Sequence, residues 1–167
     1  MKALIFSDSH GNFSVMKRII KSSSDADCVI FAGDGISDVE SLQSEFHEKM
    51  FFSVRGNNDY GSSPYGYARD DELLFVLEGK RIFLTHGHSF GVKSSLNTLF
   101  AKAQRDEIDI VIFGHTHEPY EEYNKEKRPF YFFNPGSVGY YSDGGYSFGV
   151  LNINNGNILL SPGKAKE

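Results

Sequence analysis

Apolar and polar positions in the first third of the chain alternate between strand-like and helix-like spacing. Three short apolar runs have the length of buried strands: Lys2–Ser7, Cys28–Ala32 and Met50–Val54. Between the first two, apolar residues recur on one helical face: Val15, Met16, Ile19 and Ile20. The segment Ile36–Phe46 has weaker helical spacing. The pattern predicts three strands separated by two helices.

The rest of the chain adds hairpins to this alternation. Two strands, Leu73–Leu77 and Arg81–Thr85, are expected to form a hairpin, followed by an amphipathic helix at Val92–Ala103. Further strands are expected at Ile108–Phe113 and Phe130–Phe133. A terminal hairpin is expected to join Ser147–Ile153 to Asn157–Leu160 through Asn154-Asn155-Gly156.

The segments between these elements are predicted as loops, at 60–71, after Phe113 and at 134–145, with a frayed tail at 164–167. Strand–helix alternation followed by hairpins favours a mixed α/β fold with helices covering one or more sheets. A length of 167 residues predicts one domain over 1–167.

Composition narrows the function classes. A net charge of −5 gives no indication of the basic face that grips long nucleic acid. The one cysteine, Cys28, lies in an apolar run and is expected to be a buried, inert thiol. The sequence shows no secretory signal and no apolar run of membrane-spanning length. Together these features favour a cytoplasmic protein.

Side chains that can bind metals follow the ends of successive predicted strands. They are Asp8 and His10, then Asp34, then Asn57 and Asp59, then His86 and His88, and finally His115 and His117. Five of the six histidines are in this set. Ligands of α/β sheets bind at the carboxyl ends of the strands, so we expect these side chains to converge in space.

Each of these motifs also has a structural interpretation. An Asp after a strand is usually a turn residue or a helix cap, and Asn57-Asn58-Asp59 is equally good turn chemistry. The recurrence of such motifs after five strands favours a metal site over chance. Imidazoles and carboxylates suit Mn, Fe, Co, Ni or Zn, and one cysteine cannot build a structural zinc finger. Two cations about 3.5–4 Å apart would need an anionic bridge, and a water held between them could attack phosphorus in line.

The order Asp-x-His, Gly-Asp, Gly-Asn-x-Asp, His-Gly-His, Gly-His-Thr-His resembles the calcineurin-like metallophosphoesterases. The short length and Asn-Pro-Gly-Ser at 134–137 are similar to the small YfcE-type phosphodiesterase branch. The resemblance covers about residues 1–160. It implies a four-layer α/β/β/α sandwich of two mixed sheets, with a dinuclear metal site at one sheet edge.

The resemblance also implies roles for single residues. The first metal would be held by Asp8, His10 and His117, and the second by Asn57, His86 and His115, with Asp34 bridging both. Asp59 would lie behind the ligands and orient the Asn57 loop. His88 would support the ligands or contact substrate. Asn58 stands where many relatives carry a histidine that assists the leaving group, and an amide cannot deliver a proton.

Several positions keep two interpretations. Asn12 fits a helix cap as well as a site residue, and the segment 134–137 fits a plain turn as well as a phosphate-side loop. The exposed position expected for His47 gives it no role. Five tyrosines could stack a nucleobase or simply pack: Tyr120, Tyr123, Tyr140, Tyr141 and Tyr146.

The sequence therefore predicts a phosphodiesterase that hydrolyses a small phosphodiester with two divalent cations, manganese first and Ni, Fe, Zn or Co as alternatives. A phosphomonoesterase using the same site is the alternative enzyme. A non-catalytic module, similar to the retromer subunit related to this branch, is the alternative of another class. The complete ligand set favours catalysis. The sequence leaves a homo-oligomer open.

Overall fold

The computed structural model of the protein describes residues 1–59, 70–125, 128–140 and 144–166. Tyr141 and most of the loop predicted at 60–71 lie outside the described residues. In the part of the chain that the structure describes, no helix is long and apolar enough to cross a membrane.

Two five-stranded sheets form the centre of the fold. The first has the order β10-β9-β1-β2-β3 and the second the order β4-β5-β6-β8-β7. The strands of the first sheet are β1 (Lys2–Phe6), β2 (Cys28–Phe31), β3 (Met50–Ser53), β9 (Tyr146–Asn154) and β10 (Asn157–Ala165). Those of the second are β4 (Glu72–Leu77), β5 (Lys80–Thr85), β6 (Ile110–Ile112), β7 (Pro119–Asn124) and β8 (Phe130–Pro135).

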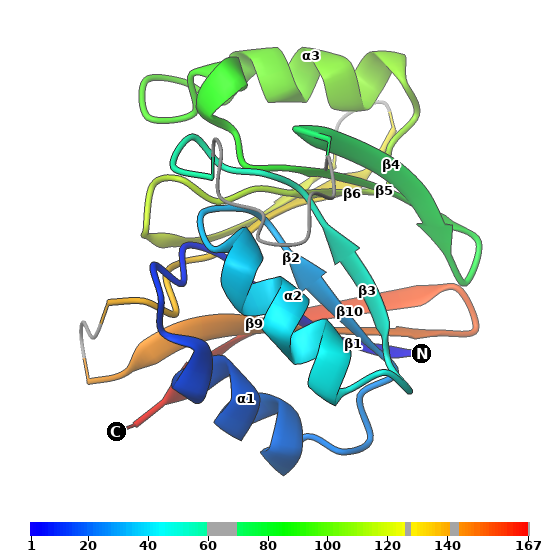
Figure 1. Ribbon diagram of the computed structural model, residues 1–167. Coiled ribbons are helices and arrows are strands. Elements are labelled where there is room, and N and C mark those ends of the chain that lie inside the picture. The colour runs from blue at the N-terminus through cyan, green and yellow to red at the C-terminus, as the bar shows by residue number, and fades with distance from the viewer. Residues whose placement is uncertain (60–69, 126–127, 141–143, 167) are drawn as a thin grey trace.

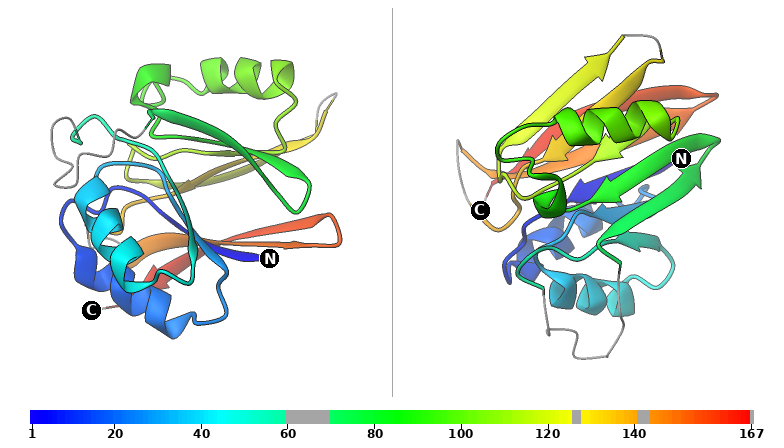
Figure 2. Two further views of the ribbon diagram at one scale, coloured as in Figure 1. Left: turned by 45° about the vertical axis from the view of Figure 1, so that its right-hand side comes forward. Right: turned by 90° about the horizontal axis from the view of Figure 1, so that it is seen from above.

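The two sheets pack face to face between helices (Figures 1 and 2). Helices α1 (Phe13–Ser22) and α2 (Ile36–Glu45) cover the outer face of the first sheet, and α3 (Asn97–Arg105) covers the outer face of the second. A short 3-10 helix, η1 (His88–Phe90), precedes α3. This arrangement confirms the predicted four-layer α/β/β/α sandwich of two mixed sheets.

Alternation along the strands explains the layers, because successive side chains of a strand point to opposite faces. In β1, Ala3 and Ile5 enter the core between the sheets, whereas Leu4 and Phe6 enter the core beneath α1 and α2. In β6, Val111 faces the α3 side. Strands buried on both faces therefore appear in the sequence as continuous apolar runs.

The structure corrects the sequence pattern at α3, β7 and β10. Helix α3 begins at Asn97, whereas the sequence pattern placed its start at Val92. Segment 92–96 is made of turns, with the amides of Ser94 and Ser95 donating to Gly91 O. Strand β7 lies in what was predicted as a polar loop, and β10 runs to Ala165, into the tail that was expected to fray.

Parallel pairing directs the candidate residues to one place. Strands β1, β2 and β3 are parallel neighbours, as are β5, β6 and β8. The loops that leave their carboxyl ends therefore gather at the same edge of the sandwich.

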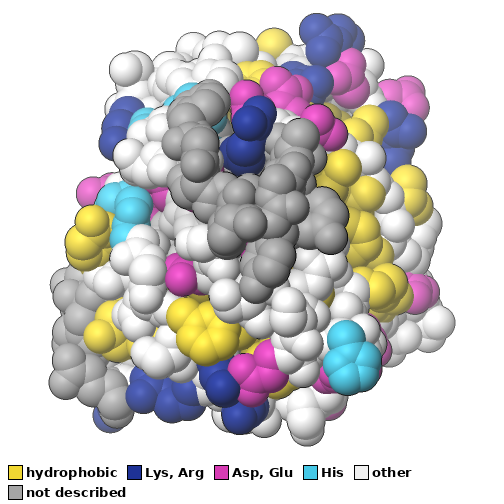
Figure 3. All heavy atoms as spheres, viewed as in Figure 1, with side chains coloured by type: hydrophobic (Ala, Val, Ile, Leu, Met, Phe, Trp, Pro, Cys, Tyr) yellow, Lys and Arg dark blue, Asp and Glu magenta, His cyan; other side chains and the backbone are white. Residues whose placement is uncertain are grey.

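On the face shown in Figure 3, hydrophobic side chains gather along the flank where β4 lies in Figure 1. Leu74 and Val76 of this edge strand are exposed.

Candidate metal centre

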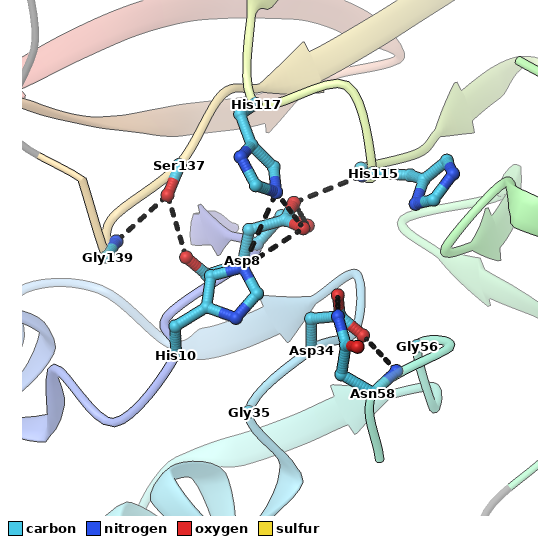
Figure 4. Close-up of polar contacts among 12 residues, drawn as sticks. Asp8, His10, Asp34, Gly35, Gly56, Asn58, His115, His117, Ser137 and Gly139 are labelled. Atoms are coloured by element: carbon cyan, nitrogen blue, oxygen red, sulfur yellow. Dashed lines mark hydrogen bonds and ion pairs between the residues drawn. The ribbon is translucent and has the colours of Figure 1, made fainter. Parts of the chain in front are cut away.

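The first cluster of candidate ligands surrounds the carboxylate of Asp8. His117 Nε2 lies 3.2 Å and His10 Nε2 3.9 Å from Asp8 Oδ1, and the two Nε2 atoms are 3.4 Å apart. Figure 4 shows the rings of His10 and His117 facing Asp8, with Asp34 and Asn58 beside them. These three side chains could hold one metal ion.

The second cluster shares Asp8 with the first. His86 Nε2 lies 3.4 Å from Asp34 Oδ2 and 3.9 Å from Asp8 Oδ1, and these three side chains could also hold an ion. Asn57 Oδ1 is 3.2 Å from the same His86 nitrogen. The other ring nitrogen of His86 is 2.7 Å from Ala32 O, which fixes the orientation of the ring. Six predicted ligands are thus brought together by five loops.

His115, the seventh predicted ligand, borders the second cluster without joining its close contacts. Its ring centroid is 5.0 Å from that of His86, and in Figure 4 the ring points away from Asp8. Its backbone amide donates to Asp8 Oδ2 at 3.1 Å. The ring centroid of His88 lies 6.2 Å from that of His115. The Nδ1 atom of His88 is buried without a hydrogen-bond partner among the described residues.

Asn58 and Asp59, which follow β3 and the candidate ligand Asn57, make different contacts. Asn58 donates to Asp34 twice, from its backbone amide to Oδ1 at 2.8 Å and from its side-chain amide to Oδ2 at 2.5 Å. Asp59 is buried and accepts four backbone hydrogen bonds. Asn58 therefore holds Asp34, and Asp59 lies behind the ligands as the resemblance implied.

Burial and charge perturb the titration of these groups. Burial raises the pKa of Asp8 above its ordinary value, although His86 opposes this shift. Burial alone would raise the pKa of Asp34, but hydrogen bonds from His86 and Asn58 hold it below its ordinary value. Burial lowers the pKa of His115 to about 4, with the positive charges of His86 and then Lys93 adding to the shift. Neutral imidazole and ionised carboxylate are the forms that bind metals.

The backbone is strained at the candidate ligands. Eight described residues other than glycine have positive φ, and five of them are predicted ligands: Asp8, His10, Asp34, His115 and His117. Such conformations cost about 1–3 kcal/mol each and cluster at functional sites. Turn formation alone does not account for five of them at one sheet edge. No residue pattern predicts this strain directly, apart from the glycines beside these residues.

Three buried polar side chains hold the ligand loops: Asp38, which the sequence analysis did not single out, and Asn134 and Ser137 of the Asn-Pro-Gly-Ser segment. Asp38 accepts hydrogen bonds from Ser9 Oγ at 2.6 Å and from Gly11 N at 3.0 Å. Ser137 Oγ donates to Asp8 O at 2.7 Å. Asn134 donates to Gly114 O at 2.9 Å and to Thr116 Oγ1 at 3.0 Å. The Asn-Pro-Gly-Ser segment is therefore neither a plain turn nor a demonstrated phosphate loop, but a support for the loops that carry Asp8, His115 and His117.

Two glycines allow the loops to approach. A Cβ built on Gly56 would overlap the Asp34 carboxylate, and one built on Gly114 would overlap Ser7 Oγ. Any larger residue would push apart the loops that carry the candidate ligands. Other predicted positions lie outside the centre: His47 is exposed beyond α2, and Asn12 precedes α1 without a side-chain cap bond.

The residues present fit a metal centre. Asp8 Oδ1 is buried and has no hydrogen-bond partner among the residues that the structure describes, while Ser7 Oγ and the His115 amide both donate to Oδ2. A buried carboxylate oxygen without a partner is costly. Three imidazole nitrogens lie within 3.9 Å of this oxygen. Divalent cations bound by the two clusters would give the oxygen and the three nitrogens the partners that they lack.

Comparison with known proteins identifies the family. The model of the calcineurin-like phosphoesterase superfamily domain matches residues 1–156, so the chain belongs to that superfamily. The probable metallophosphoesterase YsnB of Bacillus subtilis is 32% identical over 83% of this chain and 75% of its own length. The phosphodiesterase YfcE of Escherichia coli is 29% identical over 90% of this chain and 87% of its own.

Solved structures share the architecture. In the structural comparison, YfcE of E. coli aligns over 98% of this chain and 99% of its own with a TM-score of 0.65 and 26% identity. Vacuolar protein sorting 29 from Cryptosporidium parvum aligns over 99% of this chain and 98% of its own, with a TM-score of 0.70 and 19% identity. The second likeness shows a common fold alone.

Proposed function

We propose that the protein is a metal-dependent phosphodiesterase that hydrolyses a small phosphodiester at the centre around Asp8 and Asp34. The observation that carries the proposal is the partnerless, buried Asp8 Oδ1 within 3.9 Å of three imidazole nitrogens. Membership of a phosphoesterase superfamily and similarity to YfcE support it.

The proposal assigns the two cations to two sets of side chains. One set is Asp8, His10 and His117, the other is Asn57, His86 and His115, and Asp34 bridges them. Manganese is the first candidate among the divalent transition metals. When bound, the cations would supply positive charge for the phosphate oxygens and promote ionisation of the attacking water.

The remaining roles belong to the chain itself. Asn58 donates two hydrogen bonds to Asp34, and so fixes the bridging carboxylate in its ionised form. Because an amide cannot deliver a proton, the departing oxygen receives none from Asn58. His88 is half-buried and its ring centroid lies 5.5 Å from that of His86, so this histidine is the candidate for contact with substrate. Burial and the charge of His86 lower the pKa of His88, so it would be a neutral hydrogen-bond partner near pH 7.

Two other functions compete with this one. A phosphomonoesterase would use the same site. A non-catalytic interaction module is suggested by the likeness to vacuolar protein sorting 29, and this likeness is one of fold alone. Against the module stands the gathering of a second carboxylate and three histidines around the buried Asp8 carboxylate.

Hydrolysis of a matched pair of esters tests the proposal. Metal-free protein would be reloaded with Mn, Ni, Zn, Fe or Mg and assayed with bis(p-nitrophenyl) phosphate and p-nitrophenyl phosphate. We expect the diester to be cleaved faster, and a chelator to stop the reaction. Preference for the monoester would favour the phosphomonoesterase, and failure with every metal would favour the interaction module.

A further inference from the structure

A cavity of about 430 Å³ opens beside the metal centre. One wall comes from the turn segment before α3 and the other from the chain that connects β6 to β7 and the start of β7. Its apolar lining residues are Val92, Leu96, Phe113, Pro119 and Tyr120. Its polar lining residues are Lys93, Thr116 and Glu118. This volume lies in the range of small-molecule sites, about 300–1,000 Å³.

Two observations connect the cavity to the metal centre. Thr116, in its lining, stands in the chain between the predicted ligands His115 and His117. Phe113, also in the lining, stands two residues before His115 in the chain. The cavity therefore borders the loop that carries His115 and His117, and we expect a substrate arm that leaves the metal centre to reach it.

The lining has two chemical parts. Lys93 is exposed, and no carboxylate of the described residues forms an ion pair with it. A free ammonium next to a phosphate site attracts phosphate oxygens. Tyr120 is exposed and offers an aromatic ring on which flat heteroaromatic rings can stack. The buried Phe113 ring packs beside it, with 6.2 Å between the ring centroids. Glu118 can accept hydrogen bonds from sugar hydroxyls or ring amino groups.

We propose that this cavity, lined by Lys93 and Tyr120, binds a nucleoside arm of the phosphodiester, so that the substrates are nucleotide diesters. The inference rests on the proposed function, because it assumes that the phosphate lies at the metal centre. The base occupies the apolar lining, and Lys93 meets the phosphate. Tyr123, three residues along β7, lines a different cavity and packs on Tyr131.

Calorimetric binding of two probes tests the cavity. Adenosine 5′-monophosphate and ribose 5-phosphate carry the same sugar phosphate, and only the first has a ring base. We expect the metal-loaded protein to bind the first about 5- to 100-fold tighter, from the usual strength of base stacking. Inorganic phosphate released in the same samples is measured, so that turnover is not mistaken for binding.

Matched variants separate the two parts of the lining. Tyr120→Ala should weaken binding of adenosine 5′-monophosphate at least about threefold and leave ribose 5-phosphate unchanged, whereas Tyr123→Ala should change neither. Lys93→Gln should weaken both probes about two- to fivefold, with a smaller dependence on salt, whereas Lys125→Gln should not.

The outcomes distinguish this inference from the proposed function. Equal affinity for the two probes in a protein that hydrolyses diesters would overturn the cavity assignment and leave the enzyme standing. Selective binding of adenosine 5′-monophosphate that Tyr120→Ala removes would support the cavity even in a protein that hydrolyses no diester. The same loss in Tyr120→Ala and Tyr123→Ala would also overturn the inference, because the effect would not belong to this cavity.

Discussion

Replacing Asp59 by Ala should loosen two ligand loops at once. Its carboxylate is buried and accepts backbone hydrogen bonds from Asp34 and Gly56 at 2.8 Å, from Gly35 at 2.8 Å and from Ile36 at 3.0 Å. These bonds connect the loop after β2 to the loop after β3. Alanine would leave four donors without their charged acceptor.

The magnitude follows from those four contacts. A hydrogen bond to a charged group contributes about 1.5–3 kcal/mol. In the variant, water that enters the space left by the carboxylate would partly satisfy the four amide donors. The expected loss is therefore about 4 kcal/mol in the free energy of unfolding, comparable with breaking a buried ion pair. For a protein of 167 residues this corresponds to a decrease in Tm of roughly 8–16 °C.

Urea unfolding of metal-free wild type and Asp59→Ala measures this loss without a contribution from bound cations. Asp25→Ala is the matched control, because the Asp25 carboxylate is exposed and, within the described part of the chain, forms its ion pair with Lys2. It should unfold near the wild-type midpoint. A decrease below about 1 kcal/mol in Asp59→Ala would refute the reasoning, because the four bonds would then contribute little.

Three further predictions follow from single residues. Asp34→Ala should abolish turnover and lower the bound metal, whereas His47→Ala should match wild type in parallel kinetics and elemental analysis. Burial raises the pKa of Cys28 to about 12, so at pH 8 the thiol stays protonated and should react with Ellman's reagent only after unfolding; rapid reaction of the native protein would disprove this. Because Asn58 supplies no proton, kcat/KM should fall steeply as the leaving-group pKa rises, and Asn58→His should flatten that dependence; a shallow wild-type dependence that becomes steep only in His88→Ala would transfer the role to His88.

Most of the fold was predictable because elements that are buried on one or both faces carry apolar residues in a recognisable spacing. Strands β1, β2 and β6 are covered on both faces, and apart from Lys2 at the start of β1 their residues are apolar. Helix α1 places Val15, Met16, Ile19 and Ile20 against the first sheet, which explains its clear spacing. The terminal turn was also predictable, since Asn155 and Gly156 both adopt positive φ.

Strand β7 was missed because it has no buried face to mark it. Five of its six residues are exposed, and it is held to β8 by backbone pairing at the edge of the second sheet. The start of α3 was misplaced for the opposite reason. Val92 and Leu96 pack against the α3 core from turns, with a spacing that imitates a helix.

The sequence predicted which residues line the candidate site better than it predicted how they are arranged. Each predicted ligand follows a parallel strand, so topology alone brings the loops together. The sequence could not show that Asp8 would lie in both clusters, or that Asp38, Asn134 and Ser137 would support the loops. These contacts join residues that are distant in the sequence, such as Ser9 with Asp38 and Asp8 with Ser137. Tertiary packing of the loops brings them together, so no local pattern predicts them.

The central claim is that one site holds two cations and that hydrolysis needs both. Its most direct test is a titration of metal-free protein with manganese, in which bound metal per chain by elemental analysis and diester hydrolysis are measured on the same samples. We predict about two equivalents bound per chain, with activity rising mainly with the second. Full activity at one equivalent, or a single tight site that a chelator does not affect, would contradict the account.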